Sequence, residues 1–468
     1  MKIFNIIFSV LLCGLYGFLS YITSDLGLLS NKILLSLSIA GWITIILIIV
    51  GLFKLKSKIF KGLLYFISLI IMIISFFGSY YIKTTISFID DFGNKNDEFN
   101  YYYVITKKDS NYNKIDELKN KSIGLSSEIT DEVINKIKID YKGRRYDDLT
   151  VLVNDLYKNK IDAILISDVN EYLIETQDEL FTKRVKVIDT IKIPKKEEIT
   201  ESNKKITDEP FVVFISGIDT GGKISRVSRS DVNIVATINP VNNEVLLTTI
   251  PRDFYVQLHG TNGTKDKLTH AGIYGINKSI TTIEDLLGVN IDYYVRVNFD
   301  TVVKLVDQIG GITIYSDQNL NFCDIKQGNN NLDGACALRF ARERYSYKTG
   351  DRHRGENQEE VIKAIIRKIE TTPTLLTKYS SIMENLSNNF ETNVTNDVIK
   401  SFIKLQMKQM PSWKVKTYNL NGFDSHNYTY SGGRRMLYVM EPDYKTVDRA
   451  KELINGMLSG KKFNELGL

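Results

Sequence analysis

The chain has 468 residues, enough for two or three domains, and its hydrophobic content of 43% is that of a globular protein. The formal net charge is only +5, from 60 Lys and Arg against 55 Asp and Glu. The sequence contains no P-loop, no zinc-ligand spacing and no Ser-His-Asp or Cys-His set, which excludes the enzyme classes built on those motifs.

The N-terminal region contains three apolar runs, at residues 3–22, 33–53 and 63–82. Each run is about 20 residues long, the length that crosses a bilayer as a helix. A cleaved signal peptide fits poorly, because no small-residue cleavage site precedes the two further runs. Buried helices of a soluble protein are the other alternative, and three consecutive runs of spanning length argue against it. Residues 1–82 are therefore predicted to form three transmembrane helices.

The connectors between these runs differ in charge. The second connector, KLKSKIFK, carries four lysines, whereas the first carries one lysine and one aspartate. Because positive charge marks the cytoplasmic side, a multi-pass protein of the cell membrane is predicted, with a cytoplasmic N-terminus. Everything after Tyr81 is then extracellular, where ATP is absent and nucleic acid is not an expected partner.

Residues 98–193 have the pattern of a small accessory α/β domain, in which VLVNDLYKNK is an amphipathic helix and DAILI a buried strand. These phrases resemble half of a bacterial extracellular solute-binding domain. No convergent arginine and acid that would clamp an amino acid are apparent, so we expect an accessory or docking role. The Lys- and Glu-rich residues 194–209 are predicted to be a solvated linker.

Strands and helices alternate through residues 210–468. FVVFISGID, DVNIVATINP and NEVLLTTIP are predicted strands, and an amphipathic helix after YYVRVNF stops at Gly310-Gly311. This alternation predicts the α/β class, with a mixed β-sheet covered by helices (α-β-α).

Charged residues gather at the predicted strand ends. Asp219 ends the first strand, Asp231 begins the second, and TTIPRD closes the third on Arg252 and Asp253. Ligands of α/β proteins bind at strand carboxyl ends, and the arginine fork suits phosphate oxygens. Aspartates are oxygen ligands suited to Mg²⁺. The pattern indicates a pyrophosphate site with a bound cation.

More arginines follow in LRFARERY and DRHRGENQEEVI. The alternative for any single arginine is a surface ion pair, the commoner case. We retain that interpretation for Arg339 and Arg352.

From about residue 211 to 458 the chain resembles the LytR–CpsA–Psr family of cell-wall enzymes. The resemblance rests on GID, RSDVNIVATINP, LLTTIPRDFYV, KLTHAGIYG and LDGACALRFARER, in the order of the family. It implies a membrane-anchored phosphotransferase that moves a glycopolymer, such as a capsular polysaccharide or teichoic acid, from a polyprenyl-pyrophosphate carrier to peptidoglycan. The expected acceptor is the C6 hydroxyl of N-acetylmuramic acid, and the expected product is a phosphodiester.

The resemblance also assigns site residues. The pyrophosphate-binding set maps onto Arg229, Arg252, Arg342, Arg344, Arg354 and Gln358. The metal pair maps onto Asp219 and Asp231, which would hold Mg²⁺ or Mn²⁺. The expected catalytic residues are Asp231, Asp253 and Arg252; either carboxylate could be the base, and Asp253 could instead hold Arg252. Many members have Arg-Gln-Gln where this chain has Asn357-Gln358-Glu359, so one cationic contact is missing.

The expected partners are the lipid-linked glycopolymer, peptidoglycan, membrane lipid and the cell-wall synthesis machinery. Helices around residues 280–287 and 302–309 are candidates for a groove holding the carrier tail, against plain core packing. Two other functions stay open: a polyprenyl-pyrophosphate phosphatase, and a non-enzymatic sensor or attenuator of wall stress. For His270 a hydrogen bond at a helix start or turn is expected, and for Cys323 and Cys336 free thiols rather than a bridge.

Overall fold

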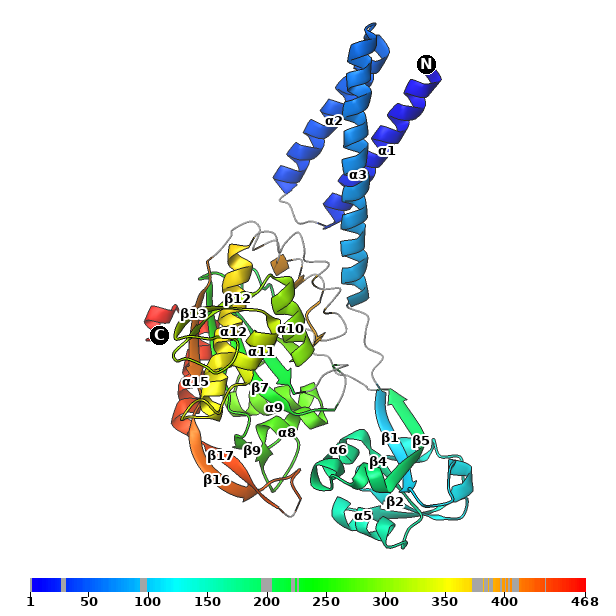
Figure 1. Cartoon of the computed structure of the whole chain (residues 1–468), viewed down its shortest axis with the longest axis vertical. Helices are drawn as coiled ribbons and strands as arrows, with labels where there is room; N and C mark the ends of the chain where they lie inside the picture. The colour runs from blue at the N-terminus through cyan, green and yellow to red at the C-terminus, as the bar shows by residue number, and fades with distance from the viewer. Residues whose placement is uncertain are drawn as a thin grey trace.

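The computed structural model describes residues 2–26, 31–92, 99–194, 204–219, 227–372, 390–395, 412–433 and 435–468, with isolated positions between these segments. The described chain forms an N-terminal helical region, a small α/β domain and a larger α/β domain (Figure 1). Residues 195–203 of the predicted linker lie outside the described residues.

The helical region consists of α1 (Lys2–Leu26), α2 (Asn31–Lys54) and α3 (Lys58–Phe92). Within the described chain these are three helices long and apolar enough to cross a membrane, as predicted. Leu12 and Leu52 belong to a small buried cluster between them, whereas many other apolar side chains of the region are exposed. That distribution suits helices surrounded by lipid. The last helix runs past residue 82, its predicted end, to Phe92.

The small domain is built on a sheet with the strand order β3-β2-β4-β1-β5. Its strands are β1 (Phe99–Lys107), β2 (Ser122–Ser126), β3 (Lys142–Tyr146), β4 (Ala163–Ser167) and β5 (Val185–Pro194). Its helices are η1 (Ile115–Leu118), α4 (Asp131–Ile134), α5 (Leu149–Tyr157), α6 (Asp168–Gln177) and α7 (Phe181–Arg184). The predicted strand DAILI becomes β4, which is buried along its whole length.

The large domain is built on a mixed sheet with the order β14-β11-β6-β7-β8-β15 among its described strands. These are β6 (Phe211–Ile218), β7 (Ser230–Asn239), β8 (Glu244–Thr249), β11 (Tyr293–Asn298), β14 (Phe390–Thr392) and β15 (Lys414–Asn419). β11 lies parallel to β6 and β15 parallel to β8, while β7 is antiparallel to both of its neighbours. The carboxyl ends of β6, β8, β11 and β15 therefore share one edge with the start of β7.

Helices cover both faces of this sheet, so the α-β-α prediction is confirmed. The helices are α8 (Leu268–Ala271), η2 (Gly272–Tyr274), α9 (Ile276–Leu287), α10 (Phe299–Gln308), α11 (Gly334–Arg342), α12 (Asp351–Thr371), α15 (Tyr444–Leu458) and η3 (Phe463–Glu465). Alternate residues of β7 point to opposite faces. Val235 packs in the core with α9 and α15, whereas Ile234 and Ala236 pack on the side of α12.

Short strand pairs complete the large domain. They are β9 (Tyr255–Val256) with β10 (Asp266–Lys267), β12 (Ile312–Ser316) with β13 (Gly328–Leu332), and β16 (Gly422–Tyr428) with β17 (Met436–Pro442). Gly310 and Gly311, predicted to end a helix, follow α10 with φ of 78° and 79°, where glycine has no Cβ penalty.

Cys323 and Cys336 form a disulfide, so the expectation of free thiols is wrong. Cys323 lies in the connection between β12 and β13, and Cys336 lies in the first turn of α11, where its N–H donates to the capping Asp333. The hairpin folds back on the helix start and brings the two Cα atoms to 6.0 Å, within bridging range. The sequence could not show this approach, because it depends on how the hairpin packs.

Candidate active site

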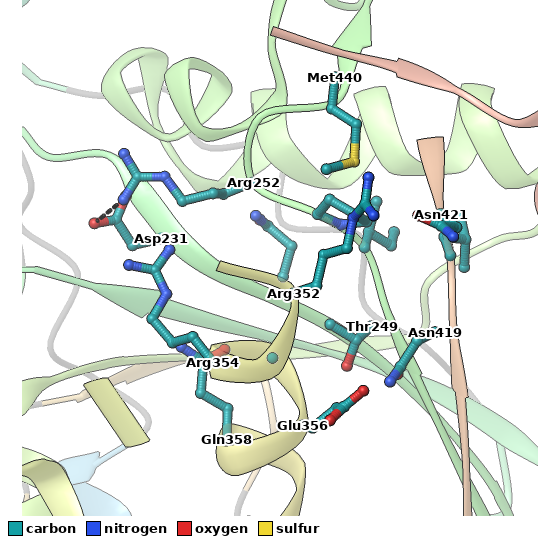
Figure 2. A pocket seen from close by; sticks show the side chains of 15 residues that line it. Asp231, Thr249, Arg252, Arg352, Arg354, Glu356, Gln358, Asn419, Asn421 and Met440 are labelled. Carbon is teal, nitrogen blue, oxygen red and sulfur yellow. Dashed lines mark ion pairs between the residues drawn. The ribbon is translucent and has the colours of Figure 1, made fainter. Parts of the chain in front are cut away.

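A polar pocket lies at the shared strand edge of the large domain (Figure 2). It is lined by the start of β7, the end of β8 with the PRD turn, the first turns of α12 and the end of β15. Of the predicted site residues, it brings together Asp231, Arg252, Arg354 and Gln358. Asp231 lies at the start of β7 and Arg252 in the turn after β8, as the strand-end hypothesis expects, whereas Arg354 and Gln358 lie on α12.

Arg252 and Asp231 form the closest ion pair in this pocket. Arg252 Nη1 lies 2.7 Å from Asp231 Oδ2, and both side chains are less than a fifth exposed. The hydroxyl of Thr269 donates to the other oxygen, Asp231 Oδ1, at 2.9 Å. Asp231 is therefore held from two sides, with its charge balanced by an arginine that is itself aimed at the pocket.

Asp253 makes a different set of contacts. Lys267 Nζ donates to Asp253 Oδ1 at 2.9 Å, and Arg252 Nε lies 3.8 Å from Asp253 Oδ2. Asp253 does not line the polar pocket. The contacts match the alternative in which this carboxylate holds Arg252 in place. Sequence reasoning missed Lys267, whose only signal was its position at the head of KLTHAGIYG.

His270 lies in the same segment and serves the fold. Its Nδ1 contacts Asp266 Oδ1 at 2.6 Å, and Asp266 Oδ2 in turn accepts from the backbone of Ser431. All three side chains are buried. This agrees with the expected hydrogen bond at a helix start.

Asp219 and Arg342 form a second acid–arginine pair at the same edge of the sheet. Arg342 Nη2 lies 3.5 Å from Asp219 Oδ1, with both side chains about half exposed. Arg342 is the last residue of α11, and its guanidinium also lies over the Phe299 ring, 4.2 Å from the centroid. Both predicted metal ligands, Asp219 and Asp231, are thus paired with predicted pyrophosphate-binding arginines.

Of the remaining predicted arginines, some line the polar pocket and others do not. Arg354 and Gln358 are four residues apart on α12, hence on one face of the helix. Arg344 follows α11, is exposed, and donates to the Tyr345 hydroxyl at 2.7 Å; it does not line the pocket. Arg352 forms the expected surface ion pair, with its Nη2 3.4 Å from Asp424 Oδ1, and it also lines the pocket and donates to Gly422 O at 3.1 Å.

Arg339, the other arginine interpreted as a surface residue, lies over the Phe322 ring, 4.5 Å from the centroid, and outside the pocket lining.

The Asn357-Gln358-Glu359 segment points in two directions. Gln358 lines the pocket, whereas Asn357 is buried and donates to Phe340 O at 3.2 Å. Glu359 is 2% exposed and accepts a 2.6 Å hydrogen bond from the Thr249 hydroxyl. Burial raises the pKa of this carboxyl to about 7. Asn357 therefore serves the core.

An apolar cavity adjoins the polar pocket and shares Gln358 with it. It is lined by the face of β6 and β7 and by aliphatic side chains of α10, α11 and α12, with Arg342 among them. Of the two helices proposed for a lipid groove, α10 contributes Val302 and Leu305 to this cavity. The other, α9, packs in the core on the opposite face.

In the described chain, no three His, Cys, Asp or Glu side chains cluster as a preformed cation site. The donor set still suits Mg²⁺, which is bound by one or two carboxylates with substrate phosphates and water. Asp219 and Asp231 are chemically of that kind, and each would have to share its carboxylate between the cation and an arginine.

Several known proteins are similar to this chain. The chain is 36% identical over 245 residues to the polyisoprenyl-teichoic acid–peptidoglycan teichoic acid transferase TagU of Enterococcus faecalis, covering 51% of this chain and 77% of that protein. It is 31% identical over 279 residues to biofilm regulatory protein A of Streptococcus mutans, covering 55% and 66%. The crystal structure of B. subtilis TagV matches with a TM-score of 0.46 and 29% identity, covering 54% of this chain and 98% of that one.

The model of the LytR_cpsA_psr family matches residues 175–451, more than half of the chain. The matched range contains the mixed sheet, both acid–arginine pairs and the two adjoining cavities. The chain belongs to the LytR–CpsA–Psr (LytR_cpsA_psr) family.

Proposed function

We propose that this protein is a membrane-anchored transferase that moves a glycopolymer from a polyprenyl-pyrophosphate carrier to peptidoglycan, forming a phosphodiester. The relative from Enterococcus faecalis is named as a transferase of teichoic acid to peptidoglycan. The three N-terminal apolar helices suit an anchored enzyme. We place the two α/β domains outside the cell on the lysine bias of the KLKSKIFK connector.

The observation that carries the proposal is a stripe along α12. Arg354 and Gln358 line the polar pocket, and Gln358, Ile362 and Ile366 line the apolar cavity. These positions recur every four residues, so they follow one face of the helix. A ligand lying along this stripe meets cationic and polar groups first and aliphatic groups next. A polyprenyl diphosphate has that order of chemistry, with a charged head joined to a hydrocarbon tail.

The reaction needs one bond made and one broken. The acceptor hydroxyl, which we take to be C6 of N-acetylmuramic acid, attacks the phosphorus that carries the glycopolymer. The bond from that phosphorus to the bridging oxygen breaks, and polyprenyl phosphate leaves with the electron pair. Arg252 and Arg354 stabilise the charge on the diphosphate by bidentate hydrogen bonds.

The hydroxyl proton goes to a carboxylate. Asp231 lines the pocket and Asp253 does not, so Asp231 is the better placed acceptor, with Asp253 and Lys267 positioning Arg252. Asp219 and Asp231 would hold Mg²⁺, which supplies further neutralisation of the phosphate charge when bound. Arg252 and Arg342, the partners of these carboxylates, would bind the phosphate oxygens.

The test uses the full chain in detergent micelles with a polyprenyl-pyrophosphate donor carrying a labelled glycan. Label is expected to move to peptidoglycan fragments, with polyprenyl phosphate released in equal amount. Release at the same rate without fragments, and with no label transferred, would instead support the phosphatase. Absence of both products with donor bound would support the non-enzymatic alternative.

A further inference from the structure

The β16–β17 hairpin is attached to the polar pocket at one end. Met440 of β17 lines the pocket, and its backbone N–H donates to Asp253 O, in the turn after β8, at 2.7 Å. Arg352, which also lines the pocket, donates to Gly422 O at the start of β16 at 3.1 Å. From there the two strands run outward from the large domain (Figure 1). Hydrogen bonds on both strands thus fix the hairpin beside the pocket.

One face of this hairpin carries exposed aromatic side chains. Directly opposite residues of antiparallel strands lie on the same face, and every second pair shares it. Three pairs form the face that begins at the pocket, and we call them the hairpin face: Asp424 with Met440, His426 with Tyr438, and Tyr428 with Met436. Tyr428 is 54% exposed, Met436 56% and Tyr438 36%. Val439, on the other face, is fully buried.

Side-chain contacts hold the rings of the hairpin face in place. The Tyr438 hydroxyl donates to Asp424 Oδ1 at 2.8 Å. Lys267 Nζ, which donates to Asp253, lies over the Tyr438 ring, 5.7 Å from its centroid. His426 stands edge-on to the same ring, with 5.9 Å between the two centroids. The orientation of the Tyr438 ring is therefore tied to the residues that position Arg252.

The chemistry of the hairpin face suits a carbohydrate. The C–H groups of a sugar ring pack well on the negative face of an aromatic ring. The sugar hydroxyls need donors and acceptors, which the carboxylate, imidazole and phenol groups between these rings provide. A lipid tail would instead desolvate Asp424 and His426 without pairing them. From residue 424 to residue 428 the strand rises roughly 13 Å, which leaves room for more than one sugar ring.

The position of the hairpin relative to the pocket favours the acceptor glycan over the donor glycopolymer. In phosphoryl transfer the attacking and the leaving oxygen lie roughly in line across the phosphorus. Under the proposed function the carrier leaves toward Gln358, where the pocket meets the apolar cavity. Met440 lies at the opposite end of the pocket from Gln358 (Figure 2). A glycan on the hairpin face therefore approaches from the side opposite the leaving group.

We infer that the hairpin face binds the glycan strand of peptidoglycan, with sugar rings stacked on Tyr428 and Tyr438, and so presents the acceptor hydroxyl to the polar pocket. This inference rests on the proposed function and deepens it, because it names the surface that holds the acceptor. Tyr428 belongs to the pair farthest from the pocket and acts in acceptor binding alone.

The first test measures binding without a donor, so it requires no transfer. Soluble, uncrosslinked strands of alternating N-acetylglucosamine and N-acetylmuramic acid are titrated into the full chain in detergent micelles by calorimetry. Tyr428→Ala removes one stacking ring, and affinity is expected to fall roughly three- to tenfold. Tyr428→Phe keeps the ring and is expected to bind almost as wild type does.

Tyr315→Ala is the matched control, because Tyr315 is 56% exposed and lies on another two-stranded hairpin, β12–β13. Its affinity for the glycan strands is expected to equal that of wild type. The inference would be overturned by undetectable binding to wild type, by equal affinities of wild type and Tyr428→Ala, or by an equal loss in the control.

Transfer kinetics separate the acceptor from the donor glycopolymer. In Tyr428→Ala the KM for glycan strands is expected to rise three- to tenfold, while kcat and the KM for the glycopolymer-bearing donor stay at the wild-type values. A rise in the KM for the donor alone would mean that the hairpin face holds the glycopolymer, and would overturn the inference. If wild type transfers nothing, the proposed function fails, and the binding titration still decides whether the hairpin face binds peptidoglycan.

Discussion

The polar pocket and the apolar cavity share Gln358 but use different parts of the same sheet. The polar pocket is lined by strand ends and turns, where the chain changes direction and charged side chains can reach solvent. The cavity takes the face of β6 and β7, where alternate residues are aliphatic. The helix α12 lines both, because the distance along its axis from Arg354 to Ile366, twelve residues later, is about 18 Å. One face of α12 could therefore contact both the charged part and the apolar part of one amphiphilic ligand.

The largest effect is expected when a cationic side chain is removed from the polar pocket. Arg252→Ala leaves Asp231 without its 2.7 Å partner and the diphosphate without a bidentate donor. We expect glycan transfer to fall about 10²- to 10³-fold, as for other preorganised donors. Arg339→Ala is the matched control, since Arg339 lies over Phe322 away from the pocket. A similar loss in both variants would show that Arg252 has no special role.

A second prediction concerns Glu359, buried beneath the pocket against Thr249. Its pKa is about 7 in the folded chain, above its ordinary value of 4.5. As pH rises between these values the unfolded chain ionises first, so wild type loses up to about 3 kcal/mol of stability over this range. Below it the carboxyl is protonated in both states and the loss is absent.

Glu359→Gln keeps an acceptor for Thr249 and cannot ionise. The variant is expected to gain stability relative to wild type as pH is raised from 4.5 to 8, measured by denaturant unfolding at both values. A difference between the two proteins that stays constant with pH would mean that Glu359 titrates normally.

The smallest expected effect is on the apolar side. Ile365→Trp would fill part of the cavity, while Ile369→Trp, one turn further on α12, replaces a side chain that is 41% exposed. Losing room for about two buried CH₂ groups weakens a long-chain donor roughly tenfold. Farnesyl diphosphate and a long-chain polyprenyl diphosphate should be titrated against both variants. If both variants bind the long-chain donor equally well, the carrier tail does not occupy this cavity.

The strands of the large domain could be read from the sequence because their side chains alternate, as Ile234, Val235 and Ala236 show. The sheet order could not. β15 begins at Lys414 yet pairs with β8, which ends at Thr249, and nothing local to either segment indicates the partner. The same limit hid the disulfide, which joins two segments through the packing of a hairpin on a helix.

Site residues at strand ends were predictable because strand direction brings them to one edge. Residues that act through a second segment were not. Lys267, for example, reaches Asp253 from the β9–β10 pair. Arg344 lies outside the pocket lining, after α11 has ended at Arg342, so its role in pyrophosphate binding stays a prediction.

The helix α3 is longer than the apolar window that could cross a membrane. Its apolar window ends at Tyr80, but the helix continues to Phe92. The twelve further residues add about 18 Å of helix, so under the proposed function α3 extends about that far beyond its apolar window. Under the proposed function, the peptidoglycan within its reach is the innermost layer. The length of this helix would then limit transfer to peptidoglycan strands that lie close to the membrane.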